Sequence, residues 1–286
     1  MKISIATNIS NADLPRIKNI IPHWLEVFDE NLGELLLIYD NNELSGRIKQ
    51  LHKQQYTSED ILGQLNELTK IDPRVKVLNL DYSELEVISR KWFKKGSPVR
   101  CQNGSPIYTF LYAIDKAKYD IMLKCDCDIV TYENGFTNEA IKLLDQYDIV
   151  SPPRNPLPGH TVSSRGFFIN RKKLYGSKLP IVLPKLSLIQ IAARIYRRQD
   201  IFDSKKYSLY FSLERAINDA IDKGVLTHTQ IDKKFGNTLH IISNGEANDP
   251  IMTEVVNNFK QGKWPKEQEE FSMDYSKPLW EKFLNK

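Results

Sequence analysis

The first half of the chain alternates short apolar segments with longer segments in which apolar residues recur at helical spacing. The segments "KISIATN" (2–8), "GELLLIYDNN" (33–42) and "RVKVLNLD" (74–81) read as strands, and the second, apolar on both faces, is expected to be buried. Between them, the spacing of apolar residues predicts helices over 14–28 and 61–68. Strands that alternate with helices favour a mostly parallel sheet, because each crossover lays a helix on one face of the sheet. The sequence therefore predicts an α/β fold.

The later segments follow the same rules. The segment 101–120 contains a helical pattern, with Ser105 as its N-cap and Pro106 in its first turn. Pro22 lies inside the first helical pattern, so we expect a kink or a split helix there. The remaining expectations are strands within 119–130, 147–153 and 163–174, a short strand that carries His240, and helices over 136–147 and 211–224, the last capped by Ser212 and ended by Gly224.

Composition narrows the class of function. The chain has 286 residues, a formal net charge of +4 at pH 7 and three cysteines. This charge is too small to predict nucleic-acid binding, and it is compatible with small anionic ligands or an anionic surface. Cys125 and Cys127 lie too close along an expected strand to form a disulfide, which favours a reducing cytosol. With no long apolar run and no targeting signal, we expect a cytoplasmic protein that contacts a membrane at most peripherally.

The segment "YDIMLKCDCDIV" (119–130) ends its apolar run in two acids one residue apart, Asp126 and Asp128. Acids are poor strand formers, and two carboxylates at the end of a buried run lose hydration and repel each other. On a strand, both aspartates face one side and Cys125 and Cys127 face the other. A divalent cation offsets the repulsion, and oxygen-only ligands favour Mg²⁺ or Mn²⁺, which also binds water and substrate phosphate. The alternative is a solvated turn after a strand.

In a parallel sheet, ligands bind beyond the carboxyl ends of the strands, where Asn8, Asp40, Asp126 and Asp128 would gather. A hard metal at this edge suits a diphosphate. Over most of residues 1–245 the chain resembles the nucleotide-sugar glycosyltransferases of the GT-A fold. The resemblance rests on the segments "ISIATN", "IYD", "RCQNGSPIYTFLYAIDKAKYDIMLKCDCDIV", "SSRGFFINRKKL", "SLERAINDA" and "TLH".

The resemblance implies a Rossmann-like, mixed but mostly parallel sheet flanked by helices. It implies a catalytic domain over 1–245, divided into a nucleotide-binding half (1–130) and an acceptor half (131–245). Residues 246–286 are then expected to form a helical or irregular tail packed on this domain.

The resemblance also implies roles for particular residues. Asp126 and Asp128 are expected to bind a Mn²⁺ or Mg²⁺ ion that bridges the diphosphate of the donor, a UDP- or GDP-linked sugar. His240 completes the metal or phosphate contacts, although an isolated histidine in a strand also fits a core position. Asp40 contacts the nucleoside. The full set of candidate donor-binding residues is Thr7, Asn8, Asp40, Arg100, Asn103, Asp126 and Arg165.

Electrostatics suggests how such a site works. A metal bound by Asp126 and Asp128 stabilises the charge that develops on the departing nucleoside diphosphate, and Arg100 can add a phosphate contact. An inverting enzyme also needs a base near the acceptor hydroxyl, for which Glu214 is the candidate. The alternatives are a solvated Arg100, a salt-bridged Arg165 and a Glu214 that only complements a helix dipole. The Glu-Asp pair of many inverting members appears here as "LER".

Two other functions remain open. A GT-A domain that binds a sugar nucleotide or glycan without turnover has the same residues except for a working base. The string "DCDIV" also fits the D-x-D-x-[TV] signature of haloacid dehalogenase-type phosphatases, whose first aspartate is a nucleophile. In that family the motif ends the first strand, whereas here three strands are expected to precede it.

Between residues 186 and 207, apolar residues alternate with arginine and lysine. A basic amphipathic helix of this kind binds anionic lipid, which would suit a lipid-linked acceptor as well as a glycan. The alternative is a solvated basic face beside a stripe of core residues.

Overall fold

The computed structural model describes residues 1–44, 49, 52, 55–102, 104–131, 135–152, 162–163, 165–197, 209–235, 238–241, 249–263 and 274–275. The strands in these ranges are β1 (Ile3–Ile9), β2 (Leu32–Tyr39), β3 (Val75–Asn79), β4 (Ile121–Cys125), β5 (Ile129–Thr131), β6 (Ile149–Ser151), β7 (Gly166–Asn170), β8 (His228–Gln230), β9 (Thr238–Ile241) and β10 (Asp274–Tyr275). The helices are α1 (Leu14–Val27), α3 (Ser58–Ile71), α4 (Leu85–Trp92), α5 (Tyr108–Lys116), α6 (Gly135–Leu143), α7 (Arg171–Ser177), α8 (Leu188–Arg197), α9 (Leu213–Asp222) and α10 (Asp249–Lys260), with short 3-10 turns η1 (Tyr82–Glu84) and η3 (Lys233–Phe235).

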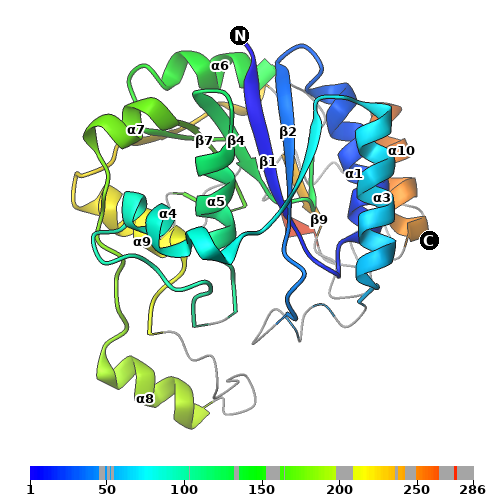
Figure 1. Cartoon of the computed structure of the whole chain (residues 1–286). Coiled ribbons are helices and arrows are strands. Elements are labelled where there is room, and N and C mark those ends of the chain that lie inside the picture. Colours follow the sequence, from blue (N-terminus) through cyan, green and yellow to red (C-terminus); the bar gives the residue numbers. More distant parts are fainter. Residues whose placement is uncertain are drawn as a thin grey trace.

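Within these residues, seven strands form one sheet in the order β3-β2-β1-β4-β7-β6-β8 (Figure 1). The first four are parallel to one another. β7 runs antiparallel to both β4 and β6, and β8 is parallel to β6. The prediction of a mixed, mostly parallel sheet flanked by helices is therefore confirmed.

Both faces of the sheet are buried, which is why β1 and β2 are apolar almost throughout rather than alternating. One core cluster lies under α1, α3, α6 and α10, and the other lies under α4, α5 and α9. The parallel strands β3, β2, β1 and β4 end at one shared edge, called here the carboxyl edge. A second sheet of described strands, β10-β9-β5, begins there, because β5 follows β4 after three residues.

Two local expectations differ from the structure. Of the kink or split expected at Pro22, the split is absent, because α1 continues through Pro22 as one helix whose Ile20, Ile21 and Trp24 are fully buried, and this burial outweighs the missing hydrogen bond; the kink stays a prediction. The predicted cap of α5 by Ser105 is wrong. The helix begins at Tyr108, and Pro106 instead pairs with Arg100 in an isolated bridge.

The cap and the end of α9 are as expected. The hydroxyl of Ser212 accepts a hydrogen bond from the backbone N–H of Arg215 at 3.3 Å. Gly224 has a φ of +67°, the left-handed conformation that ends many helices.

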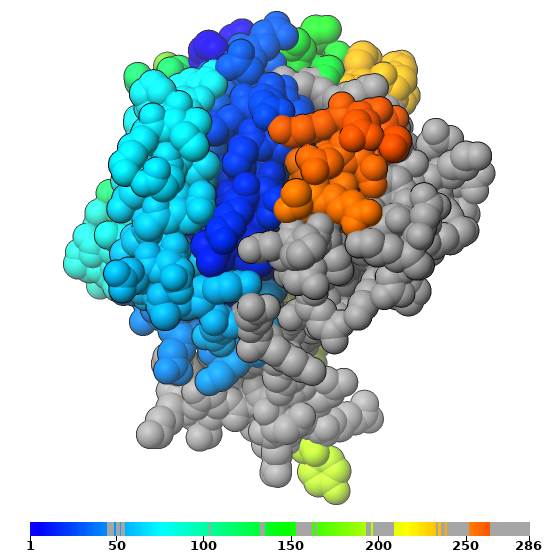
Figure 2. Space-filling model, turned by 90° about the vertical axis from the view of Figure 1, so that its right-hand side faces the viewer, coloured from blue at the N-terminus to red at the C-terminus, as the bar shows by residue number. Residues whose placement is uncertain are grey.

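Helix α10 lies beyond the predicted boundary at residue 245 and packs on α1, as Figure 2 shows beside the blue surface of α1. Met252 and Val255 are fully buried in the same core cluster as α1. Lys260 and Glu26 form an ion pair of 2.6 Å across the contact. The helix thus contributes to the core, while the division into domains stays a prediction.

All three cysteines are buried and none forms a disulfide among the described residues, and Cys125 and Cys127 pack in the α1-side core. None of the helices in the described ranges is both long and apolar enough to cross a bilayer.

Candidate functional site at the carboxyl edge

The two acids lie in a turn rather than on a strand. β4 ends at Cys125, and the backbone N–H of Ile129 donates to the carbonyl of Asp126 at 3.1 Å, which closes a tight turn. The N–H of Asp126 donates to the carbonyl of Arg165 at 2.7 Å, which ties the turn to the start of β7. Asp126 and Asp128 are both half-buried at the carboxyl edge, and Cys127 between them is buried.

Lys124, the residue before this turn, supplies a counter-charge that the sequence analysis missed. Its side chain is 1% exposed on β4, and its ammonium contacts the carboxylate of Asp126, which is 31% exposed. The ammonium also lies 3.9 Å from the centre of the Phe110 ring. A buried ammonium is costly unless it is paired, so the contact stabilises both charges. A lysine inside an otherwise apolar buried strand was the signal for this contact.

A second cation approaches the turn from α1. Arg16 is buried and forms an ion pair with Asp13 at 2.8 Å. Burial lowers the pKa of Arg16, but the charges of Asp13 and Asp128 outweigh burial and raise it overall. Arg16 is therefore within range of the negative charge of Asp128 as well as that of Asp13. Helical spacing alone gave no sign of this, because Arg16 lies within the buried surface of the helix.

His52 is a further neighbour that the sequence analysis did not single out. It is half-buried, and burial lowers its pKa, with the charge of Arg16 lowering it further. The charges of Asp13 and Asp128 act in the opposite direction. His52 is therefore close enough to feel the charge of the D-x-D turn.

At the end of β1, Thr7 and Asn8 carry buried polar atoms. Within the part of the chain that the structure describes, the hydroxyl of Thr7 and both amide atoms of Asn8 have no hydrogen-bond partner. β1 lies between β2 and β4, so these groups sit between Asp40 and Asp126. Buried polar groups without partners are rare in proteins and cost free energy unless something binds them.

Asp40, at the end of β2, is held in a network. Arg100 forms an ion pair with it at 2.5 Å and also donates to the carbonyl of Gly104. Tyr82 and Asn42 donate to the same carboxylate at 2.8 Å and 3.1 Å. Burial and the Asp40 charge raise the pKa of Tyr82 to about 12, so its hydroxyl remains a donor at neutral pH. Arg100 is thus neither a freely solvated side chain nor directed at the D-x-D turn.

For the other predicted site residues, the structure gives only part of their surroundings. The backbone of His240 on β9 pairs with Ile129, directly after Asp128, but its side chain lies outside the described part. Asn103 lies outside the described residues. Arg165 borders Asp126 through its carbonyl. Glu214 is half-buried in the first turn of α9.

A chain of hydrogen bonds connects α9 to the D-x-D turn. Asn218 on α9 accepts from the N–H of Val162 at 2.8 Å and donates to its carbonyl at 2.9 Å. The same amide donates to the backbone carbonyl of Glu214 at 2.9 Å. Val162 and Arg165 belong to the segment before β7, so the helix of Glu214 is fastened to the segment that borders Asp126.

The donor set decides which metal site fits. Among the described residues, no three His, Cys, Asp or Glu side chains are arranged to hold a metal ion. Two carboxylates in one turn suit the coordination of Mg²⁺ and Mn²⁺. These ions bind one or two protein carboxylates and complete their coordination shell with phosphate and water. The turn therefore fits a metal that binds together with a diphosphate, with Asp126 and Asp128 as its protein ligands.

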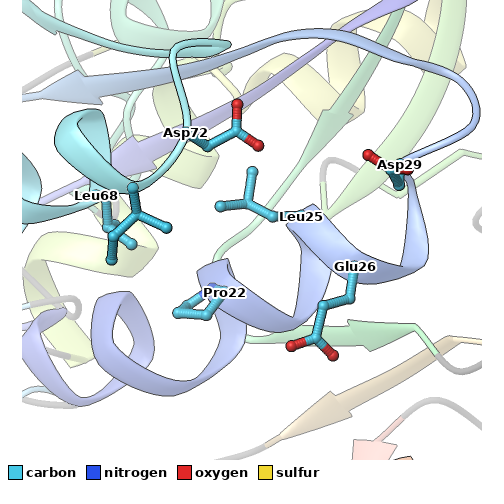
Figure 3. A pocket seen from close by; sticks show the side chains of 7 residues that line it. Pro22, Leu25, Glu26, Asp29, Leu68 and Asp72 are labelled. Atoms are coloured by element: carbon cyan, nitrogen blue, oxygen red, sulfur yellow. The ribbon is translucent and has the colours of Figure 1, made fainter.

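The hollow in Figure 3 lies at the opposite edge. It has a volume of about 410 Å³ and is lined by Pro22, Leu25, Glu26, Asp29, Leu68, Ile71 and Asp72. Lys2, at the start of β1, donates to the carbonyl of Asp29, which places this hollow at the amino ends of the strands. It is therefore not part of the candidate site.

No protein-family model matches the sequence, and neither does any curated protein. Solved structures do share its chain path. All three compared here are glycosyltransferases. The galactosyltransferase LgtC, in complex with donor and acceptor sugar analogs, is 8% identical over 81% of this chain and 74% of its own, with a TM-score of 0.43. The glycosyltransferase GlyE of Streptococcus pneumoniae TIGR4 is 8% identical over 82% of this chain and 46% of its own, with a TM-score of 0.43. The mannosyltransferase PcManGT from Pyrobaculum calidifontis, in complex with GDP-Man and Mn²⁺, is 11% identical over 60% of this chain and 45% of its own, with a TM-score of 0.38.

With TM-scores below 0.5, these likenesses do not establish an activity, which has to follow from the side chains of this chain.

Proposed function

We propose that the chain is a metal-dependent glycosyltransferase of the hexosyltransferase type, which transfers a sugar from a nucleoside diphosphate donor to a hydroxyl of a glycan or glycolipid. The observation that carries the proposal is the group of buried polar atoms of Thr7 and Asn8 that have no partner among the described residues, between the carboxylates of neighbouring strands. A ligand across the carboxyl edge would satisfy these atoms. A cytoplasmic location is part of the same proposal.

The charges at this edge favour joint binding of metal and diphosphate. The carboxylates are those of Asp13, Asp40, Asp126 and Asp128, and the cationic side chains are those of Arg16, Arg100 and Lys124. The negative charge of these four carboxylates is nearly balanced by the positive charge of the three cationic side chains. A divalent ion that binds alone would therefore add positive charge beside cations that are already present. A metal that arrives with an anionic diphosphate leaves the balance almost unchanged. Weak binding of either component alone and tight binding of both are therefore expected.

Each residue of the candidate site has a separate role in the proposed sugar transfer. Asp40, held by Arg100 and Tyr82, would accept hydrogen bonds from the nucleoside, while Asn8 and Thr7 would donate to the diphosphate. The metal, when bound, would neutralise the charge that grows on the leaving diphosphate. Lys124 and Arg16 would keep the carboxylates of Asp126 and Asp128 in position to bind that metal. Glu214 is our candidate for the base that takes the proton of the acceptor hydroxyl in an inverting reaction.

The test is a thermal-shift screen of UDP, GDP and their sugars, each with and without Mn²⁺. We expect one nucleotide with Mn²⁺ to stabilise the protein by far more than the sum of the two separate effects. Asp128→Asn, which keeps the shape of the side chain, should abolish this joint effect. The matched control is Asp232→Asn, an exposed aspartate outside the site, which should leave it unchanged.

If no nucleotide acts jointly with the metal, or if Asp128→Asn retains the full response, the assigned site is wrong. Joint binding with no release of nucleoside diphosphate in the presence of acceptors would favour the alternative of a non-catalytic binder. The phosphatase alternative is disfavoured, because the motif follows the fourth strand of the chain rather than the first.

A further inference from the structure

Helix α8 (Leu188–Arg197) projects from the body of the protein, as Figure 1 shows at the lower end of the molecule. Its first turn is well formed. Ser187 accepts a hydrogen bond from the N–H of Gln190, and the Gln190 side chain accepts one from the N–H of Ser187, which is a reciprocal cap. The first turn of the helix is therefore stabilised by residues close together in sequence.

Three of the apolar side chains described on α8 are largely exposed, whereas Ile191 is half-buried. Leu188 is 83% exposed, Ile189 is 82% exposed and Tyr196 is 91% exposed. The alternative of a basic face beside a core stripe does not hold for these three residues, because most of their surface is exposed. Large apolar side chains that gather on one exposed surface mark a binding site for a partner or a membrane.

The sequence in and around α8 carries the net charge of the chain. Residues 185–206 contain six lysine and arginine residues and two aspartates, which accounts for the whole formal charge of +4. Arg194 and Arg197 belong to α8 itself. A second copy of the chain would bring like charges together at this surface, whereas an anionic bilayer offers both an opposite charge and an apolar interior.

The base of α8 is connected to the candidate site. The N–H of Leu186 donates to the carbonyl of Leu209 at 2.8 Å, so the chain before α8 pairs with the chain that returns from it. The carbonyl of Tyr210, in the returning chain, accepts from the N–H of Gln102 at 3.3 Å. Gln102 follows Arg100, which pairs with Asp40 at the carboxyl edge. In Figure 1, β1 runs from the N-terminus at the top toward the same lower end at which α8 lies.

We propose that α8 is a membrane-docking helix, which inserts Leu188, Ile189 and Tyr196 into the interface of an anionic bilayer. Docking by this helix turns the carboxyl edge toward the lipid surface. If the proposed sugar transfer is correct, an acceptor hydroxyl on a lipid headgroup would meet the donor there. The docking itself needs neither donor nor metal.

The experiment is flotation of the full chain with vesicles, without nucleotide or metal. We compare phosphatidylcholine vesicles with vesicles that contain about a third phosphatidylserine. We expect binding to the anionic vesicles at low salt and its loss at about 1 M salt, because screening removes the attraction. The triple variant Leu188→Gln, Ile189→Gln, Tyr196→Gln should bind at least about tenfold more weakly. Arg194→Gln with Arg197→Gln should lose roughly fivefold for each charge removed.

The matched control is Ile71→Gln with Val87→Gln, which changes exposed apolar residues on α3 and α4. It should bind as the unchanged chain does, and unfolding curves should show that all the variants fold. No binding to anionic vesicles at low salt would overturn the proposal, as would equal binding by the triple variant. A dimer in lipid-free solution that the triple variant abolishes would also overturn it, in favour of self-association. Because no donor is present, these outcomes are independent of the thermal-shift screen.

Discussion

The contact between Lys124 and Asp126 makes a double-mutant cycle the most informative test of the carboxyl edge. The ammonium of Lys124 is 1% exposed, whereas the carboxylate of Asp126 is 31% exposed. The two partners therefore respond differently to the loss of the other. Asp126→Asn leaves an ammonium buried without the carboxylate that it contacts, while Lys124→Met leaves a carboxylate that water can reach.

The magnitudes follow from this asymmetry. Breaking a buried pair from one side costs about 3–5 kcal/mol, and we expect about 3 kcal/mol for Asp126→Asn because one partner is partly solvated. Lys124→Met should cost less than about 1 kcal/mol, since an apolar side chain of similar length replaces a buried charge. The double variant should also cost less than about 1 kcal/mol. For a chain of this size, about 3 kcal/mol lowers the melting temperature by roughly 6–12 °C.

The assay is thermal unfolding of the four proteins, followed by circular dichroism at constant pH and salt. We expect the double variant to melt well above Asp126→Asn alone. Additive effects of the two changes, or a loss of under about 1 kcal/mol in Asp126→Asn, would refute the reasoning. The cycle also sharpens the functional test, because the double variant compared with Lys124→Met alone shows the effect of Asp126 on nucleotide binding with little change in stability.

Two further predictions concern residues that support the site. Burial lowers the pKa of His23, which contacts the carbonyl of Thr131 at 2.5 Å, so the unfolded chain binds more protons below its ordinary pKa. Stability should fall as the pH drops below about 6.5, by up to about 1.4 kcal/mol per pH unit, and His23→Gln should flatten this slope in unfolding curves measured from pH 7 to 5. Asn218→Ala removes both partners of the Val162 backbone and should destabilise the fold by about 2–3 kcal/mol. A change of melting temperature within error would contradict that account of the segment before β7.

The sequence was sufficient to predict the layers of the fold. Apolar runs such as 33–42 are buried on both faces, and the helices between them follow from the spacing of residues that contact the sheet. Because strand and helix periodicities differ, this pattern leaves few alternatives to an α/β sheet. The end of β4 at a pair of acids and the cap of α9 at Ser212 were also predictable, since both depend on residues close together in sequence.

Tertiary structure decided which charges meet. Asp40 and Arg100 are sixty positions apart and form an ion pair, while Asp128 raises the pKa of Arg16 from another element. No local pattern encodes such pairs, because their energy depends on burial and distance rather than on spacing. The same holds for Leu188 and Ile189, whose helical pattern fits a core as well as a surface. Periodicity shows that a helix has an apolar side, but only the packing of the whole chain decides whether that side is covered.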